Sequence, residues 1–196
     1  MSGSKTRKQL VDVARQLFAK NGIDDTTMND IAVASKKGRR TLYTYFKNKE
    51  DMYFAVIESE LDLLIEMMRK VAAKDTPPDE KILELIYTHL DAIKEVVARN
   101  GTLRAEFFRD IWRVERARMR FNYHETKIFQ KVLAEGVEKG VFDVDDVAVY
   151  ADILHCCVKG IEVLYIRGRI GKGRSTMKRY VKKIVDGAFG KKKIVY

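Results

Sequence analysis

Apolar residues recur at spacings of three and four along most of the chain, which is the period of an amphipathic helix. The first such stretch spans about residues 6–20 and ends at Gly22, a residue type that readily forms a left-handed helix stop. Convincing strand alternation is absent, and the two prolines are adjacent, at Pro77 and Pro78. The pattern predicts an all-α protein. The apolar stripe of the first helix contains Leu10, Val13, Ala14, Leu17 and Phe18.

Two short helices are predicted after the first. Thr27 is an N-cap residue for a helix over 28–34, and Asp30 completes an approximate capping box. Gly38 interrupts this helix, and another short helix continues to about Phe46. Two short helices joined by a tight turn and braced by an earlier helix form the arrangement that places one helix in a DNA major groove. The spacing therefore predicts a three-helix head of the helix-turn-helix type.

A long helix and a helical bundle are predicted after the head. Asn48 is placed to cap the long helix, which begins at Lys49 and ends before the linker at Pro77 and Pro78. Further helices are expected near 79–99, 102–110, 112–139, 145–167 and 174–188. The predicted domains are a helix-turn-helix domain over 1–48, a helical domain over 49–190 and a basic tail over 191–196.

Positive charge is concentrated near the N-terminus. The chain has 38 Lys and Arg against 28 Asp and Glu, for a net charge of +10. Residues 1–50 hold eleven of the basic and five of the acidic residues, so the first quarter of the chain carries +6 of that charge. Such an excess favours a polyanionic partner and says nothing about the fold.

The most basic segment is also rich in aromatic residues. Residues 36–51, KKGRRTLYTYFKNKED, hold six Lys or Arg and three aromatic rings. Leu42 and Phe46 are four residues apart and are expected to face the core, while Lys36 and Lys37 widen the positive surface. A solvated helix face is the plain alternative, but the capped helix, the turn and the apolar pair favour DNA, where arginine bonds guanine and hydroxyls reach phosphates. The expected outward groups are Arg39, Arg40, Thr41, Tyr43 and Thr44.

Two stretches of the chain, LFAKNGIDDTTMNDIA and GRRTLYTYFKNKEDM, resemble the N-terminal DNA-binding domain of the TetR family of bacterial transcriptional regulators. The resemblance covers about residues 5–55 and implies that the helix over 38–45 reads the major groove. It also implies that Thr27 caps a helix and touches phosphate, that Tyr43 contacts the backbone, and that Lys49 holds a phosphate. The DNA-binding residues expected on this basis are Thr27, Asn29, Lys37, Gly38, Arg39, Arg40, Thr41, Tyr43, Thr44, Tyr45 and Lys49.

The turn departs from the family pattern. Where the family usually has Ala-Gly-Val-Ser, this chain has Ser35-Lys36-Lys37-Gly38. Arg40 stands where a glycine commonly precedes the threonine, which suggests a guanine in the recognised DNA sequence.

The resemblance further implies that residues 50–190 form a variable helical domain that dimerises and binds a small-molecule effector. The apolar run over 147–166 is too continuous for one covered face. We therefore expect a homodimer through the helices near 145–167 and 174–188, which would read palindromic double-stranded DNA. The regulator is expected to be a repressor whose effector alters the spacing of the two heads through the helix over 49–73. The last helix has an apolar stripe of Met177, Tyr180, Val181, Ile184, Val185 and Ala188.

Polar residues on apolar stripes are candidates for the effector pocket, because such pockets are mostly apolar with a few convergent polar groups. A histidine in this position is more often a hydrogen-bonded core residue than a ligand contact. Cys156 and Cys157 are adjacent, which disfavours a disulfide between them, and each is expected to be a small buried hydrophobe rather than a redox sensor. The candidate pocket residues are His89, Phe107, Phe108, Trp112, Arg116, Phe121, His124, Tyr150 and Glu162.

The sequence offers little for catalysis. It has three histidines and lacks a glycine-rich phosphate loop or a His-Glu-x-x-His motif, so neither a metal nor a cofactor is expected. No apolar signal core begins the chain, and charges interrupt the run over 147–166, so we expect a cytoplasmic protein without a membrane partner. A helical enzyme, or an interaction protein with an incidental basic patch, remains the alternative.

Overall fold

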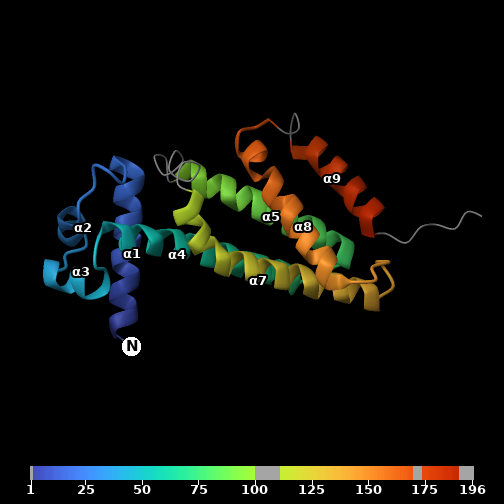
Figure 1. The fold of residues 1–196 in the computed structure, drawn as a ribbon, viewed down its shortest axis with the longest axis horizontal. Coiled ribbons are helices and arrows are strands. Elements are labelled where there is room, and N and C mark those ends of the chain that lie inside the picture. The colour runs from blue at the N-terminus through green and yellow to red at the C-terminus, as the bar shows by residue number, and fades with distance from the viewer. Residues whose placement is uncertain (1, 100–110, 170–173, 190–196) are drawn as a thin grey trace, which may run out of the picture. The chain divides into compact units, whose positions relative to one another are not determined.

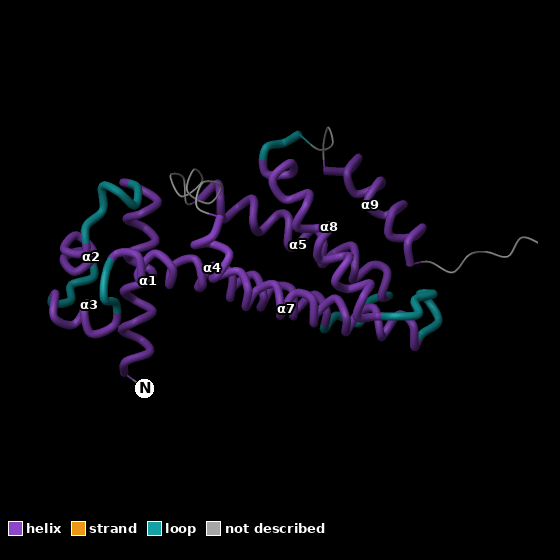
Figure 2. The backbone as a smooth tube through the Cα atoms, in the orientation of Figure 1, coloured by secondary structure: helices purple, strands orange, loops and turns teal. Residues whose placement is uncertain are grey.

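The computed structural model describes residues 2–99, 111–169 and 174–189, and describes side chains over 5–97, 118–169 and 179–189. These residues form eight α-helices and no β-strand, which confirms the predicted all-α class (Figure 2). The predicted helix over 102–110 and the tail over 191–196 lie outside the described residues. The helices in Figure 1 are α1 (Ser2–Asn21), α2 (Met28–Ala34), α3 (Arg39–Tyr45), α4 (Lys49–Ala72), α5 (Pro78–Arg99), α7 (Ile111–Glu138), α8 (Val147–Ile166) and α9 (Arg174–Phe189).

The chain divides into two compact units. Unit 1 contains Met1–Leu63 and Glu95–Arg120, and unit 2 contains Leu64–Lys94 and Phe121–Tyr196. Helices α4, α5 and α7 each contribute residues to both units. A domain boundary between residues 48 and 49 remains a prediction.

Local signals in the sequence set the helix ends of unit 1. Gly22 has a φ of 92° and its N–H donates to the Phe18 carbonyl at 3.0 Å, so it ends α1 as predicted. The capping box at α2 is confirmed: the Thr27 hydroxyl accepts from the Asp30 N–H, and the Asp30 carboxylate accepts from the Thr27 N–H at 2.8 Å. Asn48 caps α4, because its Oδ1 atom accepts from the Asp51 N–H at 2.8 Å.

The turn between α2 and α3 has a lysine, rather than its glycine, in the left-handed conformation. The left-handed residue is Lys36, with a φ of 54°, whereas Gly38 is extended and precedes α3. The Lys37 N–H donates to the Ala32 carbonyl and the Lys36 N–H to the Val33 carbonyl, both at 3.1 Å. These two bonds form a Schellman motif, in which glycine usually occupies the left-handed position. This chain places a lysine there.

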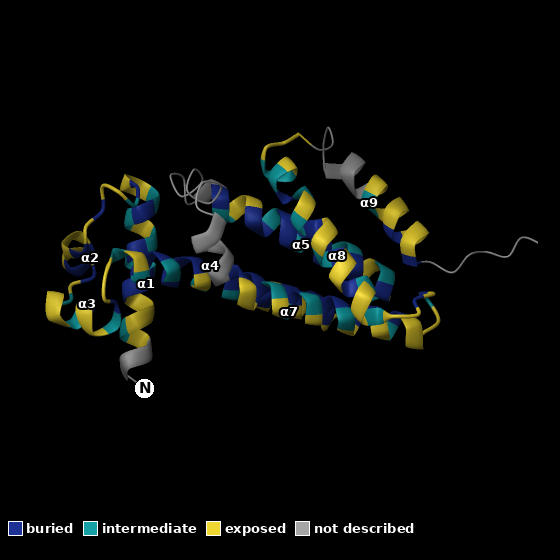
Figure 3. Ribbon diagram, in the orientation of Figure 1, coloured by how far each residue is buried: buried dark blue, intermediate teal, exposed yellow. Residues whose placement is uncertain are grey.

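Buried apolar side chains of α1, α2 and α3 form the core of unit 1. Leu42 and Phe46 are buried as predicted, and they share this core with Ile31 of α2. Within the predicted stripe of α1, Leu10, Ala14 and Phe18 are buried, whereas Val13 and Leu17 are half-buried. Figure 3 shows that buried and exposed positions alternate along this helix.

Helix α8 of unit 2 has one buried face and one exposed apolar face. The helical period places Ala151, Leu154, Val158 and Glu162 on the buried face. Cys156 and Cys157 are both exposed, so the expectation that they are buried hydrophobes is wrong. The reason is the same period, which turns residues 156 and 157 away from the buried side. None of the described helices has the length and apolar character needed to cross a membrane.

Candidate functional site

Helix α3 presents a basic and hydroxylated surface. Leu42 faces the core, whereas Arg39, Arg40, Tyr43 and Thr44 are exposed on the rest of the helix. Neither arginine forms an ion pair with any described residue of the chain, so both guanidinium groups are available to an external acceptor. The two other predicted contacts on this helix, Thr41 and Tyr45, are half-buried.

Two more predicted DNA contacts, Thr27 and Asn29, lie at the start of α2, where a capping box orders the first turn. The Thr27 hydroxyl donates to Oδ2 of Asp30 at 2.7 Å. This bond, together with the one from the Thr27 N–H, lowers the pKa of the Asp30 carboxyl. Asn29, in the same first turn, is exposed, as is Gly38 before α3, while Lys37 is half-buried.

Lys49 has an internal role. Its ammonium donates to the backbone carbonyls of Ile23 at 2.6 Å and Asp24 at 3.1 Å, and so ties the start of α4 to the loop after α1. A lysine ammonium has three N–H donors, so one remains for a phosphate. The phosphate contact implied by the resemblance stays a prediction.

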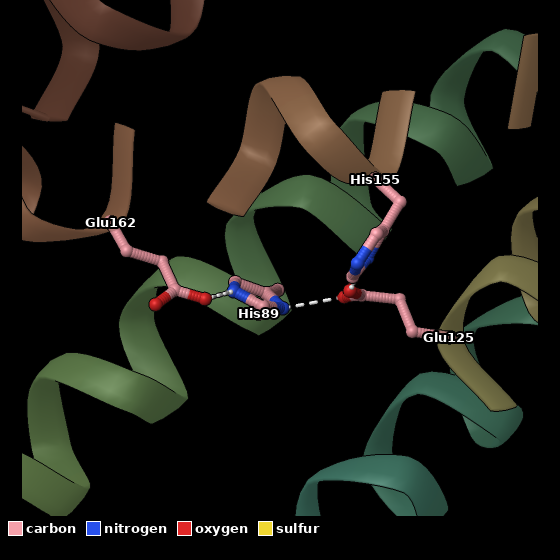
Figure 4. Close-up of polar contacts among 4 residues, drawn as sticks. All are labelled: His89, Glu125, His155 and Glu162. Carbon is pink, nitrogen blue, oxygen red and sulfur yellow. Dashed lines mark hydrogen bonds and ion pairs between the residues drawn. The ribbon is translucent and has the colours of Figure 1, made fainter. Parts of the chain in front are cut away.

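A second polar cluster lies in the core of unit 2. His89 of α5 lies between two carboxylates: its Nδ1 atom is 2.5 Å from Oε1 of Glu125 on α7, and its Nε2 atom is 2.7 Å from Oε1 of Glu162 on α8 (Figure 4). The other oxygen of Glu125 is 2.6 Å from Nδ1 of His155, also on α8. We call these four residues the His–Glu network. It joins three helices through side chains that are buried except for the edge of His155.

In the His–Glu network, His89 and Glu125 stabilise each other in their charged forms. Burial by itself lowers the pKa of His89, but the charges and hydrogen bonds of Glu125 and Glu162 outweigh it and raise that pKa to about 9. Burial alone raises the pKa of Glu125, but His89 and His155 reverse this and lower it to about 2. At neutral pH His89 is therefore an imidazolium that donates from both nitrogens.

The predicted effector pocket is only partly brought together. The rings of His89 and Phe121 lie 5.6 Å apart, and Glu162 bonds to His89. Tyr150 packs instead on Phe189, with ring centroids 5.8 Å apart, and half-buried His124 lies edge-on to the Tyr123 ring. Phe107 and Phe108 lie outside the described residues, as do the side chains of Trp112 and Arg116.

The sequence prediction missed Glu125 and His155 as members of this cluster. Glu125 lies four residues after Phe121 and three before Ile128, so the helical period already placed it on the apolar stripe. His124, the residue predicted instead, lies three residues after Phe121 and four before Ile128, so the helical period alone does not decide between the two.

An exposed basic helix held on a helix-turn-helix core defines the class of the protein as DNA-binding. The family described as bacterial regulatory proteins, tetR family, matches residues 10–56, from α1 into α4. The repressor KstR2 of Mycolicibacterium smegmatis is 31% identical over 148 residues, which are 74% of this chain and 72% of that protein. The chain belongs to the TetR family of bacterial transcriptional regulators.

Other similarities extend over nearly the whole chain. The regulator QacR of Staphylococcus aureus is 23% identical over 184 residues, which are 92% of this chain and 97% of that protein. A solved transcriptional regulator from Cytophaga hutchinsonii has a TM-score of 0.75 at 19% identity and matches 94% of this chain and 98% of its own. The likeness to that structure concerns the fold. Members of the family are regulators rather than enzymes, and they bind DNA and are generally dimeric.

Proposed function

We propose that this regulator is a repressor that binds a palindromic DNA operator as a homodimer and releases it when a small molecule binds. The observation that carries the proposal is the surface of α3, where Arg39, Arg40, Tyr43 and Thr44 are exposed over a buried Leu42. A helix held from behind by its own core can enter a major groove with its outward side chains.

The roles on this surface follow from the chemistry of the side chains. Arg39 and Arg40 read bases, because one guanidinium can donate to both major-groove acceptors of a guanine at once. Tyr43 and Tyr45 donate to backbone phosphates, as do Asn29 and Lys37 from the preceding helix and turn. The hydroxyls of Thr27 and Thr44 already donate to Asp30 and to the Arg40 carbonyl, so each donates to a phosphate only by giving up that bond. Lys49 contributes its remaining donor, and Gly38 and Thr41 lie where the start of α3 approaches the DNA.

The homodimer forms through α8 and α9. Ring contacts of Tyr150 and Phe142 with Phe189 hold the end of α9 near the start of α8, so the two helices run antiparallel in one unit (Figure 1). Both helices carry exposed apolar side chains, and a second copy would cover them in a four-helix interface. We call this surface the α8–α9 face, and its exposed large apolar residues are Val149, Ile153, Leu164, Tyr180 and Ile184.

The effector binds in unit 2, near Phe121 and the His–Glu network. Both nitrogens of His89 are already hydrogen-bonded, so a ligand can hydrogen-bond to His89 only by displacing Glu125 or Glu162. A ligand that favours one arrangement of these helices shifts the spacing of the two reading heads through α4 and lowers the affinity for the operator.

Binding measurements with two classes of DNA test the proposal. Operator sequences would be selected from random duplexes, and the dissociation constants of wild-type, Arg39→Ala and Arg40→Ala proteins compared on the selected operator and on a random duplex. We expect each arginine variant to lose about 1 to 3 kcal/mol on the operator and much less on random DNA. Exposed Lys70 of α4 provides the control Lys70→Gln, which should bind both duplexes like the wild type. Equal losses on both duplexes for both arginine variants would exclude base reading by α3.

A further inference from the structure

The residue in the left-handed position of the α2–α3 turn is a lysine. Lys36 has a φ of 54°, and among the described residues other than glycine it alone has a positive φ. The left-handed conformation brings Cβ close to the following carbonyl, so residues other than glycine adopt it at a cost. The conformation is imposed, because the Schellman bonds from Lys36 and Lys37 to the end of α2 require it.

This strained residue lies beside the DNA-reading surface. Its side chain is exposed, and it precedes exposed Arg39 by three residues, so their Cα atoms are at most about 11 Å apart. A lysine side chain is long and carries a compact charge, which suits a phosphate rather than a base edge. Glycine would fit the backbone better, but it would carry no charge.

We propose that Lys36 is a phosphate-binding residue of the DNA interface, retained at the left-handed turn position at a cost to folding stability. The proposal rests on the proposed DNA-binding surface of α3 and adds a contact where the family turn usually has glycine. Strained residues concentrate at functional sites, where the rest of the fold sustains them. Stability and DNA affinity should therefore oppose each other at this position.

Three substitutions separate charge from strain. Lys36→Gly removes both, Lys36→Gln removes the charge and keeps the strain, and Lys36→Arg keeps both. The melting temperature is measured for each full-length protein, and the dissociation constant is measured on operator and random duplexes over a series of salt concentrations. Lys70→Gln serves as the matched control, because it removes one exposed lysine charge from α4.

We expect Lys36→Gly to raise the melting temperature by about 1 to 4 °C, since glycine relieves the left-handed strain. The same variant should bind both duplexes about threefold to tenfold more weakly, with the salt slope reduced by about 1 for each bound protomer. Lys36→Gln should show the same loss of affinity without the gain in stability. Lys36→Arg and Lys70→Gln should match the wild type in both measurements.

An unchanged salt slope and affinity in Lys36→Gly would overturn the phosphate contact, and an unchanged or lower melting temperature would overturn the strain. Failure of the wild-type protein to bind any duplex would instead remove the proposed function and this inference with it. Loss on the operator alone, with normal binding to random DNA, would also contradict the proposal, because a phosphate contact acts on every sequence.

Discussion

The Nδ1 atom of His89 lies 2.5 Å from Oε1 of Glu125, and both side chains are buried in unit 2. A charged pair survives in a core only when each charge is compensated, because removal from water costs several kcal/mol per ion. Here Glu162 compensates the second nitrogen of His89, and His155 the second oxygen of Glu125. The His–Glu network is therefore a bonded polar connection between α5, α7 and α8.

Loss of the central cation should destabilise the protein strongly. In His89→Gln the carboxylates of Glu125 and Glu162 stay buried without the imidazolium that compensated both. We expect the free energy of unfolding in urea to fall by about 3 to 5 kcal/mol. The matched control is His124→Gln, at a half-buried position outside the network, which should change it by no more than about 0.5 kcal/mol. Equal stabilities of the two variants would show that the network contributes nothing.

The same network predicts a dependence of stability on pH. The raised pKa of His89, about 9 against an ordinary 6.5, gives a stabilisation that is complete below pH 6.5 and is lost as the pH rises through 9. The lowered pKa of Glu125, about 2 against 4.5, gives one that is complete above pH 4.5 and is lost as the pH falls toward 2. The network therefore stabilises most between about pH 4.5 and 6.5.

Melting temperatures of wild-type and His89→Gln proteins, measured from pH 3 to pH 10, test this window. We expect their difference to be largest between about pH 4.5 and 6.5 and to shrink as the pH rises toward 9, because deprotonation then removes the cation from the wild type as well. A difference that is constant from pH 6 to pH 10 would mean that His89 is neutral in the folded protein.

Two helical glycines should respond oppositely to alanine. A methyl group on Gly136 of α7 would overlap the buried ring of Phe142, whereas no atom of the described residues lies within 4 Å of the same position on Gly187 of α9. We expect Gly136→Ala to cost about 1 to 3 kcal/mol through overpacking, and Gly187→Ala to gain up to about 1 kcal/mol through helix propensity. Urea unfolding of both variants measures this, and a neutral Gly136→Ala would show that the Phe142 ring moves aside readily.

The sequence predicted most where one residue acts on its immediate neighbours. The caps at Thr27 and Asn48 and the stop at Gly22 depend on bonds within a few residues, so their positions could be inferred from spacing alone. The burial of Leu42 and Phe46 followed from a four-residue period that leaves only one choice of face.

The errors arose where two helices or two competing residues decide the outcome. A continuous apolar run does not reveal which of its sides a neighbour covers, and so Cys156 and Cys157 were expected to be buried. The left-handed position at Lys36 is set by hydrogen bonds to α2, and a turn whose glycine lies two residues later gave no basis for predicting it. Contacts between helices, such as that of Tyr150 with Phe189, leave no periodic signal.

Lys49 should matter for both folding and DNA binding. Lys49→Met removes the bonds to the carbonyls of Ile23 and Asp24, and we expect it to lower the free energy of unfolding by about 1 kcal/mol. It should also weaken operator and random DNA alike, because a phosphate contact carries no sequence information. Lys47→Met is the control for stability, since the Lys47 side chain is exposed. Unchanged stability of Lys49→Met in urea would mean that these bonds contribute nothing to the fold.

A charge on the α8–α9 face should separate the proposed dimer. Ile184 is 68% exposed and Ile153 is 55% exposed, so an aspartate at either position is tolerated in the single chain, where it meets water. In a two-fold interface each substitution occurs twice, and two buried carboxylates without partners oppose association. Light scattering of Ile184→Asp should therefore give the mass of one chain where the wild type gives two. Val137→Asp, at an exposed position on α7 outside this face, should remain a dimer. A dimeric Ile184→Asp together with a dimeric Ile153→Asp would place the interface elsewhere, because a four-helix contact through α8 and α9 cannot leave both positions in water.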